Sequence, residues 1–95
     1  MSVNIRFFAA AAAATGVEEQ QLDLATLDST KAFTLADLSE LLVTSFPVSA
    51  SAHTPPLAQV LTRCSFLINE VSTRDLSAPL RAGDVVDVLP PFAGG

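Results

Sequence analysis

The chain has 95 residues, of which 49% are hydrophobic, and a net charge of −5 from five Lys and Arg against ten Asp and Glu. This length and this apolar content suit one domain with one core. The negative charge opposes binding to nucleic acid or to an anionic membrane surface. A single cysteine excludes an intramolecular disulfide and a thiolate metal cluster within one chain, which fits the cytoplasm.

The first expected elements are a strand and a short helix. Apolar residues alternate with Asn4 and Arg6 over residues 3–8, which predicts a strand with one buried face. The alanines at 9–14 predict a turn or two of helix that needs packing to survive, and Gly16 is a natural stop. A secretion signal is the alternative interpretation of this start, but its cleavage would remove the strand.

A second strand and the main helix follow. Leu22 and Leu24 alternate with polar residues, which predicts a strand between residues 17 and 24 that pairs with the first. Thr34 is a suitable N-cap, with Asp37 placed to complete a capping box, and Pro47 closes the helix. The predicted apolar face consists of Leu35, Leu38, Leu42 and either Leu41 or Phe46.

The second half of the chain predicts shorter elements. In chain order they are an exposed loop at 47–56, a helical turn at 57–61, a strand at 65–68, a turn at Asn69-Glu70, a turn at 82–84 and a strand at 85–89. Asp87 interrupts the last apolar run, so we expect it to face solvent. The order of elements predicts an α+β domain, with one main helix packed across a mixed sheet in which the first and last strands can pair in parallel.

Few side chains carry chemistry of their own. His53 has no acid or cysteine nearby in the sequence and is interpreted as a surface residue. Cys64 is interpreted as a small core residue, with a nucleophile as the alternative. Glu18 and Glu19 point to opposite faces of a strand and cannot share a reacting centre. An active site within the chain is therefore disfavoured.

The final segment is the most informative part of the sequence. We expect the α+β domain to cover residues 1–89 and an extended reactive tail to cover residues 90–95, because Pro90-Pro91 must end the strand. The carboxylate of Gly95, with a reference pKa of about 3.5, is a poor electrophile and needs activation, for example as an acyl adenylate made by an ATP-using partner.

The other tail residues are candidates for binding a partner. Gly94 lacks a Cβ, so the tail can thread a narrow channel. Pro91, Ala93 and Gly94 would bind the partner along the tail, and Phe92 would anchor the tail in an apolar pocket of the partner or fold back onto its own core. The tail therefore predicts a flexible Gly-Gly ending that works inside another protein.

These residues resemble a known family. The segment at 3–8, the helix from Leu35, Asn69-Glu70-Val71, residues 80–88 and the ending Pro-Pro-Phe-Ala-Gly-Gly resemble the small subunit of molybdopterin synthase, of the ubiquitin-like β-grasp sulfur-carrier family. The resemblance implies that Gly95 is adenylated by a ubiquitin-activating-like adenylyltransferase and converted to a thiocarboxylate. Sulfur then passes to a pterin precursor in the large subunit.

The same resemblance implies a hetero-oligomer in which this chain is a carrier with no bound cofactor and no active site of its own. A ubiquitin-like protein modifier joined through Gly95 to lysines, a sulfur carrier of another pathway and a plain β-grasp interaction module are the alternatives. The alanine run and the loop at 47–56 depart from the compact family pattern, so the identity of the large subunit and of the activating enzyme stays open.

Overall fold

The computed structural model describes residues 2–26 and 32–91. Met1, residues 27–31 and the tail residues Phe92, Ala93, Gly94 and Gly95 lie outside the described residues. The elements are β1 (Ser2–Phe7), α1 (Ala10–Thr15), β2 (Glu19–Asp23), the 3-10 turn η1 (Leu24–Thr26), α2 (Leu35–Ser45), α3 (Leu57–Leu61), β3 (Ser65–Ile68), β4 (Val71–Thr73) and β5 (Val85–Leu89). Among the described residues, no helix has the length and apolar character needed to cross a membrane.

The strands form one mixed sheet in the order β2-β1-β5-β3-β4. The central strand β5 lies parallel to β1, with Asn4 opposite Val85 and Phe7 opposite Val88. The remaining neighbours are antiparallel, and β1 pairs with β2 so that Val3 is opposite Leu22. Both the parallel pair and the pairing of the first two strands, predicted from the sequence, are confirmed.

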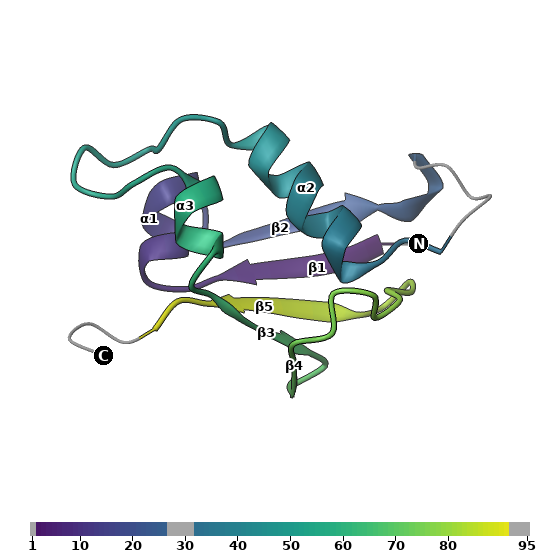
Figure 1. Ribbon diagram of the computed structural model, residues 1–95. Coiled ribbons are helices and arrows are strands. Elements are labelled where there is room, and N and C mark those ends of the chain that lie inside the picture. The colour runs from purple at the N-terminus through teal and green to yellow at the C-terminus, as the bar shows by residue number, and fades with distance from the viewer. Residues whose placement is uncertain (1, 27–31, 92–95) are drawn as a thin grey trace.

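All three α-helices cover the same face of this sheet (Figure 1). The core between the layers includes Val3, Ile5 and Phe7 from β1, Leu35, Leu38 and Leu42 from α2, and Val86 and Val88 from β5. Phe46, rather than Leu41, completes the apolar face of α2, because its ring meets the edge of Phe7 at a centroid distance of 6.0 Å. The predicted helix packed across a mixed sheet is confirmed.

The alanine-rich helix α1 is stabilised by packing, as its short length requires. Ala11 and Ala14 are buried, and the helix packs against α3. Gly16 ends it in the left-handed conformation at φ 78°. The loop at 47–56 contacts this helix, since the Ala50 N–H donates to the Ala14 carbonyl at 2.9 Å. The loop is therefore tied to the domain at one point.

The predicted caps and turns are confirmed. Thr34 and Asp37 exchange both hydrogen bonds of a capping box at the start of α2. Asn69 and Glu70 have φ values of 51° and 70°, as in the tight turns that match the twist of a β-hairpin. That hairpin adds the short strand β4, which the sequence did not predict. Gly83 has a φ of 91° in the turn before β5.

The solvent-facing position expected for Asp87 is wrong. Asp87 is only 4% exposed, because the side chain of Arg6 on the neighbouring strand lies against it. Strand alternation does place Asp87 on the face opposite Val86 and Val88. No helix among the described residues covers that face, but Arg6 shields the carboxylate from water.

Candidate functional site

The described chain leaves the sheet at the end of its central strand. Leu89, the last residue of β5, is opposite Ser65 of β3, at the end of the sheet where α1 and α3 lie (Figure 1). Pro90 is half-buried and Pro91 is exposed. Because proline has no N–H to donate, these two residues cannot extend the ladder. Pro91 is the one predicted tail-binding residue that the structure describes, and it lies where the tail departs.

One face of the sheet lies opposite the helices and is called the open face. It lies beside the end of β5, where the chain leaves the sheet. Strand alternation and the register place on it Ser2, Asn4, Arg6, Glu19, Gln21, Asp23, Leu67, Val85, Asp87 and Leu89. The Asn4 side-chain amide donates to the carboxylate of Glu19 across β1 and β2. No helix of the described residues covers the open face (Figure 1). It is therefore accessible to a partner at the point where the tail departs.

An ion pair lies in the middle of the open face. The guanidinium of Arg6 donates from Nε to Oδ1 of Asp87 at 2.5 Å and from Nη2 to Oδ2 at 2.7 Å. The Asp87 side chain is 6% exposed and that of Arg6 is 41% exposed. The hydrogen bonds from the Arg6 guanidinium to Asp87, and the negative charge of that carboxylate, raise the pKa of Arg6. The charges of Glu70 and Glu19 raise it further. The exposed ring of Phe8 lies 6.0 Å from the guanidinium carbon.

The open face is consequently acidic around the Arg6 guanidinium, because it carries the carboxylates of Glu19, Asp23 and Asp87. Sequence reasoning missed the Arg6–Asp87 pair, although polar residues interrupting two strands that pair in parallel are a signal that could have indicated it. The remaining side chains singled out from the sequence do not join this site. Glu18 and Glu19 are both exposed, as expected, and so is His53 in its loop.

Cys64 is half-buried at the edge of the core rather than fully inside it. Its thiol lies 3.2 Å from the Val60 carbonyl, to which it can donate. Burial raises the pKa of Cys64 to about 11, so the thiol is protonated at neutral pH. Since the thiolate is the nucleophilic form, this environment disfavours the nucleophile interpretation.

Comparisons with known proteins show the family and the fold of the chain. Residues 5–95 match the ThiS family. A chain from the complex of subunits 1 and 2 of molybdopterin-converting factor from Helicobacter pylori 26695 is 27% identical, with full coverage of both chains and a TM-score of 0.62. The HVO 2177 protein of Haloferax volcanii is 26% identical over 100% of this chain and 87% of that chain, with a TM-score of 0.69.

SAMP1 from Haloferax volcanii is similar in fold, with a TM-score of 0.72, 24% identity and full coverage of both chains. No curated protein matches the sequence. The fold similarities confirm the predicted ubiquitin-like β-grasp fold.

Proposed function

The chain belongs to the ThiS family, and we therefore propose that it is the sulfur-carrying small subunit of a molybdopterin synthase, with Gly95 as its working residue. The observation that carries the proposal is that the family match extends through Gly94 and Gly95, so the ending is part of the matched pattern. The 27% identity with a chain from a complex of molybdopterin-converting factor subunits supports this pathway.

The proposed chemistry takes place on the carboxylate of Gly95. One carboxylate oxygen attacks the α-phosphorus of ATP in an activating adenylyltransferase, which releases pyrophosphate and leaves an acyl adenylate. Hydrosulfide, or its equivalent released by a sulfur donor, then attacks the acyl carbon and displaces AMP, which gives the thiocarboxylate. In the large subunit that sulfur passes to a pterin precursor, and the carboxylate is restored when water replaces it. The carrier itself binds no cofactor and catalyses no step.

The fold supports this role through the position of the tail. β5 ends at Leu89, and Pro90 and Pro91, which follow it, have no N–H to extend its ladder of hydrogen bonds. The six residues after Leu89 span at most roughly 20 Å, which is enough to enter an active site of a partner docked beside the sheet. We propose that the large subunit and the adenylyltransferase meet the accessible open face in turn, in the cytoplasm, and each receives the tail.

The test is an intact-mass measurement on the full chain incubated with the activating enzyme of its host, ATP and a sulfur donor. We expect one oxygen to be replaced by sulfur, with fragmentation locating the change at Gly95. A Cys64→Ser variant should give the same product, and a chain lacking Gly95 should give none. Conversion of the pterin precursor by the loaded carrier and the large subunit then tests the pathway.

Other results would overturn the proposal. Stable conjugates in which Gly95 is joined to lysines of other proteins would identify a protein modifier. A thiocarboxylate that forms but is not consumed with the large subunit would indicate a sulfur carrier of another pathway. An unmodified Gly95 under all these conditions would indicate an interaction module whose two final glycines have no chemical role.

A further inference from the structure

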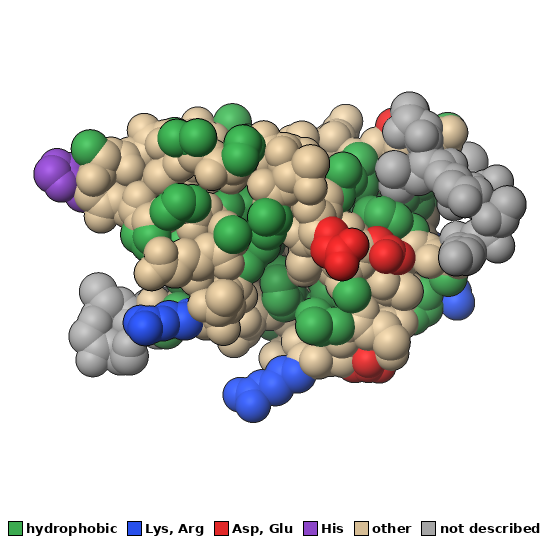
Figure 2. Space-filling model, turned by 45° about the horizontal axis from the view of Figure 1, so that its top comes forward, with side chains coloured by type: hydrophobic (Ala, Val, Ile, Leu, Met, Phe, Trp, Pro, Cys, Tyr) green, Lys and Arg blue, Asp and Glu red, His purple; other side chains and the backbone are tan. Residues whose placement is uncertain are grey.

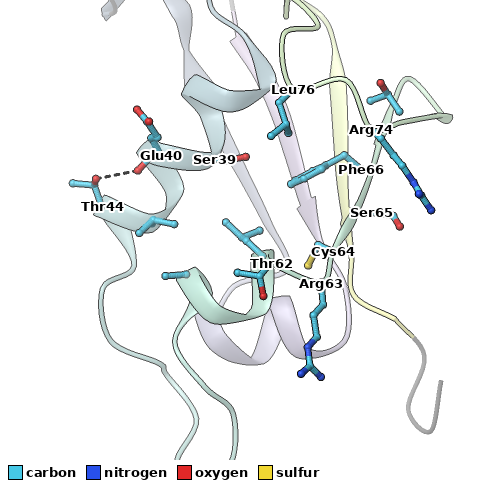
Figure 3. Close-up of a pocket in the computed structure, with 14 residues that line it drawn as sticks. Ser39, Glu40, Thr44, Thr62, Arg63, Cys64, Ser65, Phe66, Arg74 and Leu76 are labelled. Atoms are coloured by element: carbon cyan, nitrogen blue, oxygen red, sulfur yellow. Dashed lines mark hydrogen bonds between the residues drawn. The ribbon is translucent and has the colours of Figure 1, made fainter.

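A groove lies on the helix side of the sheet, away from the open face. It runs between α2, α3 and the edge formed by β3, β4 and the segment after β4 (Figure 3), and its cavity volume is about 880 Å³. That volume lies within the range typical of ligand-binding pockets. Figure 2 shows apolar side chains gathered in this hollow, with basic side chains below it and acidic side chains to its right.

Apolar side chains provide most of the exposed surface area of the groove, although more than half of its lining residues are polar or charged. The apolar part of the lining includes Val43 of α2, Ala58 and Leu61 of α3, Phe66 of β3, and Leu76. Phe66 is buried at its floor, whereas Leu76 is 48% exposed, and both point into the hollow in Figure 3. Leu76 is exposed above an apolar hollow. A partner that covers both removes apolar surface from water, which lowers the free energy of the complex.

The charges at the rim indicate the kind of partner. Two of the chain's four arginines, Arg63 and Arg74, line the groove, against one carboxylate, Glu40. Figure 3 shows both arginine side chains extending outward from the β3 side. In a chain of net charge −5, this local excess of positive charge is unusual, and it favours an anionic partner segment.

The groove has no reactive group for chemistry of its own. Cys64 contributes to its lining, but its raised pKa of about 11 keeps the thiol neutral. The other uncharged polar side chains of the lining are hydroxyls, such as those of Ser39 and Thr62, which suit hydrogen bonding. The groove is therefore a binding surface.

We propose that this groove binds a short peptide segment of a partner protein in which carboxylates flank one or two large apolar side chains. The apolar side chains cover Leu76 and Phe66, and the carboxylates approach Arg63 and Arg74. Because the groove and the open face lie on opposite sides of the sheet, such a segment can stay bound while the tail is used. The inference does not depend on the chemistry proposed for Gly95, and sulfur loading can succeed or fail independently of it.

The test uses the isotope-labelled full chain and two acetylated hexapeptides, one alternating Glu and Leu and one alternating Lys and Leu. We expect the acidic peptide to give saturable amide shifts at Val43, Leu61 and Leu76, with weaker binding as salt screens the charges. Arg74→Glu and Leu76→Asp should each weaken binding by about tenfold or more. Both residues are exposed, so neither change should unfold the domain.

Val48→Asp is the matched control, because Val48 is an exposed apolar residue, at 78%, that does not line the groove. This variant should bind like the parent chain. Equal binding of the two peptides, shifts that cluster on the open face, or no shift at about 1 mM peptide would overturn the proposal.

Discussion

Arg6 and Asp87 are 81 positions apart in the sequence, yet two hydrogen bonds of 2.5 and 2.7 Å join their side chains across the parallel strands β1 and β5. The two members of the pair differ in exposure, since the carboxylate is almost fully covered and the guanidinium reaches solvent. Removing Arg6 and removing Asp87 should therefore change the free energy of unfolding by different amounts. A buried charge without a partner is far less stable than an exposed one.

We expect Arg6→Leu to lower the free energy of unfolding, because Asp87 then loses its partner while the leucine side chain still covers part of its carboxylate. Asp87→Ala should have a smaller effect, since the Arg6 guanidinium can turn to water. The double variant Arg6→Leu/Asp87→Ala should recover part of the loss seen in Arg6→Leu. Urea unfolding of the three variants measures these differences. If Arg6→Leu were no more damaging than Asp87→Ala, Asp87 would not depend on its partner.

The capping box at the start of α2 gives a second prediction. Thr34 accepts a hydrogen bond from the Asp37 N–H at 3.2 Å, and the Asp37 carboxylate accepts one from the Thr34 N–H at 2.9 Å. Thr34→Ala should lower the free energy of unfolding by about 1 kcal/mol. The control is Thr44→Ala, because the exposed Thr44 hydroxyl donates to the Glu40 carbonyl within the same helix, away from its N-terminus. Equal losses in the two variants would mean that the cap contributes nothing specific.

Two glycines with positive φ allow a matched comparison. A Cβ on Gly16 would lie 3.0 Å from the Cβ of Ala50, whereas a Cβ on Gly83 would meet nothing within 4 Å. Both substitutions to alanine add backbone strain of about 1–3 kcal/mol. Only Gly16→Ala also presses on the loop at 47–56, so it should be the more destabilising in thermal unfolding. Combining it with Ala50→Gly should remove that excess, and an unchanged excess would exclude the contact as its cause.

The sequence predicted most of the elements because their signals are local. The alternation at β1, the capping box at Thr34 and the left-handed stop at Gly16 each depend on a few neighbouring residues. The position of Asp87 could not be derived this way, because its burial depends on Arg6 from the other end of the chain. The groove was missed for the same reason, since Val43, Leu61 and Leu76 come together only after α2 and α3 pack against the sheet edge.

The environment of Cys64 predicts slow reaction with alkylating reagents at neutral pH. A pKa raised from 9.0 to about 11 lowers the thiolate fraction at pH 7 by about a hundredfold. The greater nucleophilicity of a more basic thiolate offsets part of this, so we expect alkylation with iodoacetamide about tenfold slower than for an unburied thiol. The rate should keep rising with pH up to about 11. Mass spectrometry after timed quenching measures it, with the urea-unfolded chain as the control.

The same pKa sets a pH dependence of stability. Because the folded state holds the Cys64 proton up to a pH of about 11 and the unfolded state releases it near 9.0, the unfolded state binds fewer protons in that window. The free energy of unfolding should therefore fall as pH rises from about 9 to about 11, and Cys64→Ala should lose this part of the dependence. Urea unfolding of both chains at pH 8 and pH 10.5 provides the comparison. If the two chains showed the same slope, and if native Cys64 reacted as fast as in urea, burial would not protect the thiol.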